Sequence, residues 1–293
     1  MENNLLTLFC LVDDFCKSFM PEWEKHLLKN CFKKRKRHCT LSPSEIMTIY
    51  IHFHQSHYRD FKNYYLCYVC KNLKKSFPKL VSYSRFVSLI KTILVPLYFF
   101  LHCFTGEKTG IYFIDSTLLK VCHIKRERQN KVFCGIAKKA KSTMGWFFGF
   151  KLHLIINDKG EIMAFKITKG NVDDRITAPD LAKNLVGKLV GDKGYISIKL
   201  FKKLYQHGLQ LITKIKKNMK NKFMLLTDKF LLRKRAIIET VNDQLKNISQ
   251  IEHSRHRSPW NFLANVLAGL IAYSLQPKKP SISNYKQHLI TMK

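Results

Sequence analysis

The sequence predicts an α/β protein in three parts: a helical region over residues 1–108, an α/β domain over 109–276 and a basic tail over 277–293. Apolar residues recur at helical spacing in the first part, whereas short apolar runs alternate with helical periods in the second. Two of these runs end in an aspartate. In α/β folds, functional acids are often found at the C-terminal ends of strands. We therefore expect a mixed sheet flanked by helices, preceded by an all-α domain.

Charge is the strongest global feature of the chain. Lys and Arg total 52 against 20 acids in 293 residues, which gives a formal net charge of +32. Such a field attracts a polyanion at long range and favours nucleic acid as the partner; a lysine-rich proteome is the alternative source. The nine cysteines follow no disulfide framework. Their odd number, with no signal peptide expected, predicts reduced thiols in a cytoplasmic protein. With nucleic acid as the expected partner, this protein is expected to be associated with the nucleoid.

Two other features indicate neither a membrane protein nor a zinc protein. The apolar stretches 92–104 and 262–275 are too short to span a bilayer, and the first contains Pro96, which we expect to break it. Both predict buried helices. Cys67 and Cys70 form a CxxC pair without a second pair at zinc-site spacing, so ordinary thiols are favoured over a structural zinc.

The first region predicts short capped helices in a basic setting. The stretch Ser42-Pro43-Ser44-Glu45 combines a capping box with a proline at the first helical position. A second helix start is expected at Ser82. Such helices favour a helix-turn-helix module that binds DNA, although any small helical domain has the same pattern. The basic run 33–37 fits phosphate contacts or a solvated loop equally well.

The second region begins with three predicted strands. Apolar, aromatic-rich runs indicate strands over 111–114, 146–156 and 162–168, the last two joined by the turn at 157–160. The basic segment 120–141 is expected to form a loop or an irregular hairpin. A helix over about 176–186, a strand over 188–191, a helix over 197–207 and a strand over 209–213 follow. This order, closed by a further helix, is compatible with a ribonuclease-H-like domain.

Three acids lie on or directly after these predicted elements, in the order Asp115, Asp192 and Glu239. Asp115 ends the first run, and Asp192 ends the run 188–191, where Gly194 lets the chain turn away. Glu239 lies on a later helix. There it belongs to a polar stripe beside an apolar face, because its neighbours recur at three- or four-residue steps. The stripe consists of Arg235, Glu239, Asn242 and Lys246. Taken alone, it also fits a solvated ion pair.

At these positions the sequence resembles the DDE transposases of bacterial insertion sequences, over roughly residues 40–275. The resemblance rests on Ile114-Asp115-Ser116-Thr117, on Gly191-Asp192-Lys193-Gly194-Tyr195 and on the Arg-x3-Glu-x6-Lys pattern of Arg235, Glu239 and Lys246. Some members have a tyrosine three residues before this arginine. Leu232 stands there in this chain, so that element of the pattern is missing.

The resemblance implies a divalent-metal-dependent DNA transposase that cleaves insertion-sequence ends and joins them to target DNA by two-metal phosphodiester transfer. Asp115, Asp192 and Glu239 would be the catalytic and metal-binding residues, with two Mg²⁺ or Mn²⁺ ions as cofactors. The implied partners are terminal inverted repeats and target DNA, bound by a homodimer or larger assembly, with no membrane. The alternatives are a ribonuclease-H-like nuclease that does not rejoin ends and a catalytically inert DNA-binding protein.

Several further residues have expected roles around such a site. Tyr195 fits a DNA contact or a packing role, and His153 is expected to be a satisfied core histidine. Asp173 and Asp174 are expected to form the turn or to support the metal ligands from behind. The expected DNA-binding residues are Lys193, Arg235, Lys246, Arg255 and Arg257. For Arg255 and Arg257 a solvated basic face is the alternative.

Overall fold

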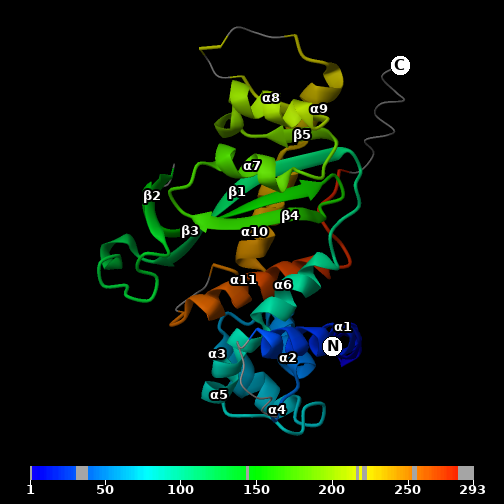
Figure 1. Cartoon of the computed structure of the whole chain (residues 1–293), viewed down its shortest axis with the longest axis vertical. Coiled ribbons are helices and arrows are strands. Elements are labelled where there is room, and N and C mark those ends of the chain that lie inside the picture. Colours follow the sequence, from blue (N-terminus) through cyan, green and yellow to red (C-terminus); the bar gives the residue numbers. More distant parts are fainter. Residues whose placement is uncertain are drawn as a thin grey trace. The chain divides into compact units, whose positions relative to one another are not determined.

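The computed structural model describes residues 2–30, 39–142, 145–215, 218–219, 223–252 and 256–282. The chain forms two compact units (Figure 1). The first unit comprises Met1–Phe104 and Leu245–Leu275, and the second comprises Thr105–Gln244 and Gln276–Lys293. The segment 245–275, expected within the α/β domain, therefore groups with the N-terminal helices. The basic run 33–37 lies outside the described residues.

The first unit is helical. A long α11 (Pro259–Ser274) packs against both α2 (Pro43–Gln55) and α6 (Leu94–His102), and α1 (Glu2–Lys29) packs against the same two helices. The remaining elements are α3 (Phe61–Asn63), a π-helical stretch over Tyr64–Val69, α4 (Cys70–Asn72), α5 (Tyr83–Ile90) and a 3-10 turn over Lys91–Ile93.

Both predicted helix starts are confirmed in this unit. The backbone N–H of Glu45 donates to Ser42 Oγ at 3.1 Å, and the Ser42 N–H donates to Glu45 Oε2 at 2.7 Å, which completes the capping box of α2. Ser82 caps α5 in the same way by accepting from the Arg85 N–H. Each cap contributes about 1 kcal/mol of stability.

The helical segment Tyr83–His102 is, among the described residues, the one helix that is long and apolar enough to cross a membrane by length and composition. Its residues Phe86, Leu97 and Phe100 are buried within the first unit, which accounts for its apolar character. A 3-10 turn over Lys91–Ile93 interrupts the segment just before Pro96, near the expected break. Pro96 lies in the first turn of α6, where a missing N–H costs no helical hydrogen bond.

The described residues of the second unit form a six-stranded mixed sheet with the strand order β2-β3-β1-β5-β6, in which β4 also pairs with β3. The strand β1 is antiparallel to β3 and parallel to β5, and β5 is parallel to β6. The strands are β1 (Ile111–Cys122), β2 (Lys138–Ser142), β3 (Gly145–Asn157), β4 (Ile162–Lys169), β5 (Gly187–Gly191) and β6 (Leu209–Thr213). The predicted α/β class with a mixed sheet is thus confirmed.

Two predictions for the sheet need correction. The strand β1 continues past Asp115 to Cys122, because its pairing with β3 extends over the whole of this length. The segment 120–141 also contributes a strand, β2, which pairs with the first part of β3. The basic residues Lys138, Lys139 and Lys141 hid this strand, since lysine is common on the exposed edge strands of sheets.

Helices flank the sheet, and one of them, α10 (Ala236–Asn247), carries Glu239. Tyr112 and Ile114 of β1 form a buried cluster with Leu181 of α7 (Asp174–Leu181) and Leu200 of α8 (Ile198–Gln206), so these helices cover one face (Figure 1). Two further helices, α9 (Leu226–Lys234) and α10 (Ala236–Asn247), follow β6. A 2.6 Å ion pair from Lys188 of β5 to the buried Asp228 ties α9 to the sheet.

The described start of the basic tail belongs to this unit. Ile282 N donates to the Asp158 carbonyl at 2.9 Å, at the turn between β3 and β4. Gly160 lies so close to the Pro280 carbonyl that a Cβ added there would come within 2.0 Å of this oxygen. Residues 276–282 therefore cover the β3–β4 turn, and 283–293 lie outside the described residues.

Candidate active site

Asp115 and Asp192 lie where the pairing of two parallel strands ends. The last paired residues of β1 and β5 are Phe113 and Val190. Asp115 and Asp192 each lie two residues further along, so continuing the register places them level and on the same face of the sheet. Asp192 is exposed and caps the 3-10 turn Lys193–Tyr195 by accepting from the Gly194 N–H at 3.3 Å.

The helix α10 supplies the third acid. Since Ile114 and Ser116 face α7 and α8, the alternation of the strand directs Asp115 to the opposite face. There the Asn242 side chain donates from Nδ2 to Asp115 Oδ2 at 3.1 Å. Glu239 lies one turn before Asn242 on α10. The apolar positions of this helix, Ile238 and Val241, are fully buried, which fixes the direction of its polar stripe.

The electrostatics of Asp115 connect the three acids. Burial raises the pKa of Asp115 to about 6, and the positive charge of Arg235 opposes this shift. The negative charges of Asp192 and Glu239 raise the pKa further, so Asp115 lies within electrostatic range of both acids. Arg235 also forms an ion pair with Glu239, one turn along the helix, in which the arginine is largely buried and the glutamate is exposed.

The donor chemistry of these residues fits a divalent cation. Carboxylate oxygens are the ligands that Mg²⁺ and Mn²⁺ prefer, and a bound cation would relieve the repulsion felt by the half-buried Asp115. In the part of the chain that the structure describes, no three His, Cys, Asp or Glu side chains already form a ligand cluster. Of the three carboxylates, that of Glu239 is engaged in the ion pair with Arg235.

Four of the five predicted DNA-binding residues lie among the described residues, two in each unit. Lys193 is exposed directly after Asp192, and Arg235 lies within electrostatic range of Asp115. Lys246 and Arg257 belong to the first unit, where Lys246 pairs with Glu252 at 3.1 Å and Arg257 is exposed. Arg255 lies outside the described residues.

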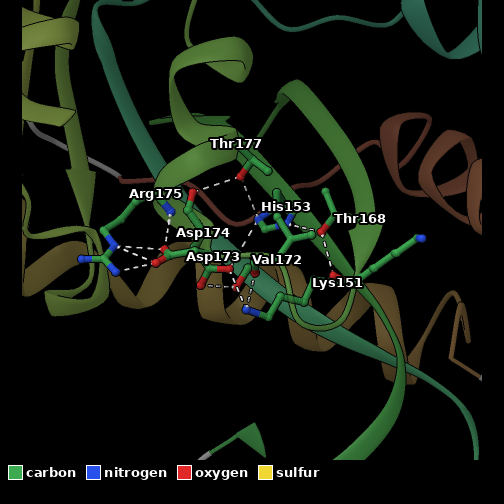
Figure 2. Close-up of polar contacts among 10 residues, drawn as sticks. Lys151, His153, Thr168, Val172, Asp173, Asp174, Arg175 and Thr177 are labelled. Atoms are coloured by element: carbon green, nitrogen blue, oxygen red, sulfur yellow. Dashed lines mark hydrogen bonds and ion pairs between the residues drawn. The ribbon is translucent and has the colours of Figure 1, made fainter. Parts of the chain in front are cut away.

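A second polar cluster lies on the other face of β1, centred on Asp174 at the start of α7 (Figure 2). Asp174 Oδ2 accepts from the Ser116 hydroxyl at 2.9 Å, and Asp174 Oδ1 accepts from Lys151 Nζ at 3.0 Å. Lys151 Nζ also donates to the Val172 carbonyl at 3.0 Å. The sequence predicts a supporting role for Asp174 but none of these contacts. Lys151 and His153 alternate within an otherwise apolar strand, and this pattern could have indicated that both side chains belong to a polar cluster on one face.

His153 is a satisfied core histidine, as predicted. It is fully buried, its Nε2 lies 2.8 Å from Thr168 Oγ1, and its Nδ1 lies 3.2 Å from Thr177 Oγ1. Burial lowers the pKa of His153 to about 4, so the ring is neutral at pH 7. Its 3.7 Å approach to Asp174 is therefore a contact with a neutral ring, and Lys151 is the cation that pairs with Asp174.

Tyr195 has the packing role that was one of its two predicted alternatives. The side chain is buried in the core cluster of α7, α8 and the sheet, against Ile114 and Gly191. Its hydroxyl is buried and makes no hydrogen bond within the described part of the chain. Burial raises the pKa of Tyr195, and the charges of Asp174, Asp115 and Asp192 raise it further. The hydroxyl is therefore protonated at any physiological pH.

Comparison with known proteins identifies a family for this chain. A family model described as a transposase DDE domain matches residues 105–259, which is more than half of the chain. Among solved structures, the chain is similar to a piggyBac transposase in a synaptic complex with hairpin DNA, determined by cryo-electron microscopy. The two share 11% identity over 98% of this chain and 84% of that one, with a TM-score of 0.43. No curated protein matches the chain.

Proposed function

Because the chain belongs to the transposase DDE domain family, we propose that it cleaves the ends of an insertion element and joins them to target DNA. Members of this family cleave nucleic acid and generally use divalent metals. The observation that supports the proposal best is the electrostatic coupling of Asp115 to both Asp192 and Glu239, across a strand, a strand end and a helix.

In this proposal Asp115, Asp192 and Glu239 bind two Mg²⁺ or Mn²⁺ ions. The chemistry such ions supply is activation of the attacking water or 3′-hydroxyl and stabilisation of the leaving oxygen. Asn242 orients Asp115 through its hydrogen bond. Arg235 holds Glu239 before DNA binds and then turns to a phosphate, which releases the Glu239 carboxylate to the site.

The positive charge of the chain supports DNA as the partner. Lys193 would contact the backbone beside Asp192, and Lys246, Arg255 and Arg257 would contact other phosphates. The capped helices α2 and α5 of the first unit are the proposed helix-turn-helix elements. Since two element ends must be joined to one target, we propose that the DNA-bound protein is at least a dimer.

Isosteric replacement of each acid tests the function. Asp115→Asn, Asp192→Asn and Glu239→Gln keep the shape of the side chains and remove their charge. We expect each to lower the rate of cleavage of labelled element ends in Mg²⁺ by roughly a thousand-fold, because each removes several kcal/mol of stabilisation. The matched control is Asp180→Asn, which removes an exposed acid of α7 that pairs with Lys166.

The products decide between the candidate functions. Joined element and target strands support a transposase, and cleaved ends without joined strands indicate the nuclease. Binding without cleavage under either Mg²⁺ or Mn²⁺ indicates an inert DNA-binding protein. Cleavage by Asp192→Asn at the wild-type rate would remove Asp192 from the catalytic set.

A further inference from the structure

The Asp174 cluster lies beside the residue that follows Asp115. Ser116, whose hydroxyl donates to Asp174 Oδ2 at 2.9 Å, directly follows Asp115 in β1. The cluster itself is rigidly built. Lys151 ties Asp174 to the turn before α7 through the Val172 carbonyl, and the Thr177 hydroxyl donates to the Asp174 carbonyl at 3.0 Å (Figure 2). Asp174 is thereby fixed at both its side chain and its backbone.

The strand β1 needs support at this point. Its ladder with β5 ends at Phe113, so within the described residues Asp115 and Ser116 have no strand partner on that edge. On the other edge they remain paired with Leu154 and His153 of β3. Asp115 is therefore in a stretch of strand that backbone hydrogen bonds hold from one edge only. The hydrogen bond from Ser116 to Asp174 restrains this stretch from the α7 side.

Stability alone does not explain a polar cluster here. The preceding residues on this face of β1, Tyr112 and Ile114, pack in the apolar core, and the change to polar contacts begins at Ser116. The ion pair of Lys151 and Asp174 is mostly buried, with side-chain exposures of 17% and 26%. Desolvation cancels much of the attraction in such pairs, and apolar residues of similar volume stabilise a core equally well. The ion pair does supply direction, because its partners are held at defined atoms.

We propose that Asp174 is a positioning residue for the acidic site. By accepting the Ser116 hydroxyl, it fixes the backbone of β1 next to Asp115 and so fixes the direction of the Asp115 carboxylate. The helix α7 also contacts the 3-10 turn Lys193–Tyr195 that follows Asp192, so one helix supports the segments that carry both aspartates. This inference rests on the proposed function, in which both aspartates bind metal.

Two substitutions at Ser116 isolate the hydrogen bond. Ser116→Thr and Ser116→Val introduce side chains of nearly the same shape, both suited to a strand, and only threonine keeps the hydroxyl. We expect Ser116→Val to bind Mn²⁺ about ten-fold more weakly than Ser116→Thr, measured by electron paramagnetic resonance of the free ion. Single-turnover cleavage should slow by roughly 10- to 100-fold, as for other groups behind metal ligands. Thermal unfolding of the two variants should coincide.

A double-mutant cycle shows whether Ser116 acts through Asp174. In an Asp174→Asn background the charged acceptor is gone, so the threonine and valine variants should bind Mn²⁺ equally. The positioning role would be overturned if, with Asp174 unchanged, Ser116→Thr and Ser116→Val had equal Mn²⁺ affinity and equal cleavage rates. If Ser116→Val does not fold, Ser116→Ala compared with the wild type gives the same contrast without added atoms.

Failure of the proposed function would look different. In that case Asp115→Asn and Asp192→Asn would bind Mn²⁺ as tightly as the wild type, and the wild type would cut no DNA. If only the positioning role of Asp174 is wrong, the wild type still cleaves DNA and Asp192→Asn does not. The two Ser116 variants then bind Mn²⁺ and cleave DNA equally. The two results therefore separate the metal site from the network behind it.

Discussion

Asn242 and Asp115 are joined by a 3.1 Å hydrogen bond from an amide nitrogen of α10 to a carboxylate oxygen of β1. The other amide atom, Asn242 Oδ1, is buried and accepts no hydrogen bond within the described part of the chain. The bond to Asp115 therefore determines which way the amide is turned. It also links the helix that carries Glu239 to the strand that carries Asp115.

Replacing this amide by a carboxylate should make folding depend on divalent metal. Asn242→Asp keeps the shape but sets a second acid against Asp115, so we expect it to destabilise the fold by about 1–3 kcal/mol without metal. Added Mg²⁺ should restore much of this loss, and it should raise the thermal midpoint of the variant more than that of the wild type. An equal effect of Mg²⁺ on both proteins would place the cation elsewhere.

Lys193 should contribute to DNA affinity in a salt-dependent way. If it contacts one phosphate, Lys193→Gln should reduce the slope of log affinity against log salt by about 0.9. The matched control is Lys159→Gln at the β3–β4 turn, where Lys159 pairs with Glu107 at 2.6 Å. The control slope should equal the wild-type slope. Equal slopes for all three proteins would exclude Lys193 from the DNA contact.

Alanine should be tolerated at Gly194 and should destabilise the fold at Gly187. A Cβ at Gly194 would meet no atom within 4 Å, so Gly194→Ala should change stability by less than about 0.5 kcal/mol. At Gly187 the φ angle is +120° and a Cβ would come within 2.2 Å of the Gly110 carbonyl oxygen. Gly187→Ala should therefore destabilise the second unit by more than about 2 kcal/mol, as measured by denaturant unfolding.

The same pair tests how closely DNA approaches Asp192. We expect Gly194→Ala to keep its fold and to cleave DNA more slowly, because the new methyl group would lie where the backbone of the substrate passes. Wild-type cleavage by a fully folded Gly194→Ala would show that no such approach occurs. Gly187→Ala should lose cleavage only in proportion to the fraction of unfolded protein.

His54 should make the first unit less stable in acid. It is buried, its Nδ1 lies 2.5 Å from the Ser249 carbonyl, and burial lowers its pKa to about 4. The unfolded chain binds a proton near the ordinary pKa of about 6.5 and the folded chain does not. Stability is therefore fully present above pH 6.5 and is lost as the pH falls towards 4, by up to about 3 kcal/mol.

Unfolding measured across this pH range checks the prediction for His54. His54→Gln should flatten the pH dependence, whereas His26→Gln, which removes an exposed histidine of α1, should leave it unchanged. His52 is buried with a pKa lowered to about 4 by the same cause, so a residual slope is expected. A slope unaffected by His54→Gln would contradict the assignment.

Local rules account for most of the fold that the sequence predicts. The caps at Ser42 and Ser82, the strands over β3 to β6 and the start of α8 all follow from patterns within a few residues. The strand β2 is not predicted from the sequence because its exposed lysines obscure the apolar pattern of a strand. The extension of β1 is not predicted either, because its last residues are held by pairing with β3, and no local sequence pattern encodes that contact.

The same distinction applies to the candidate site. Helical spacing predicts that Arg235 and Glu239 are neighbours, and they form an ion pair. The bond between Asn242 and Asp115 joins positions 127 residues apart in the sequence, so spacing carries no information about it. The contacts of Ser116 and Lys151 with Asp174 also cross between elements and depend on how α7 packs on the sheet. Order along the chain identifies the acids, and tertiary packing determines their supports.

The division of the chain has a consequence for how it folds during synthesis. The N-terminal helices leave the ribosome first, yet α11, against which α2 and α6 pack, is made only after the whole sheet. The second unit in turn waits for residues 276–282, which cover the β3–β4 turn. The first unit is therefore incomplete until residue 275 has emerged, and the second until about residue 282. The nascent chain must therefore keep two unfinished cores apart, a situation in which chaperones and slow translation favour correct folding.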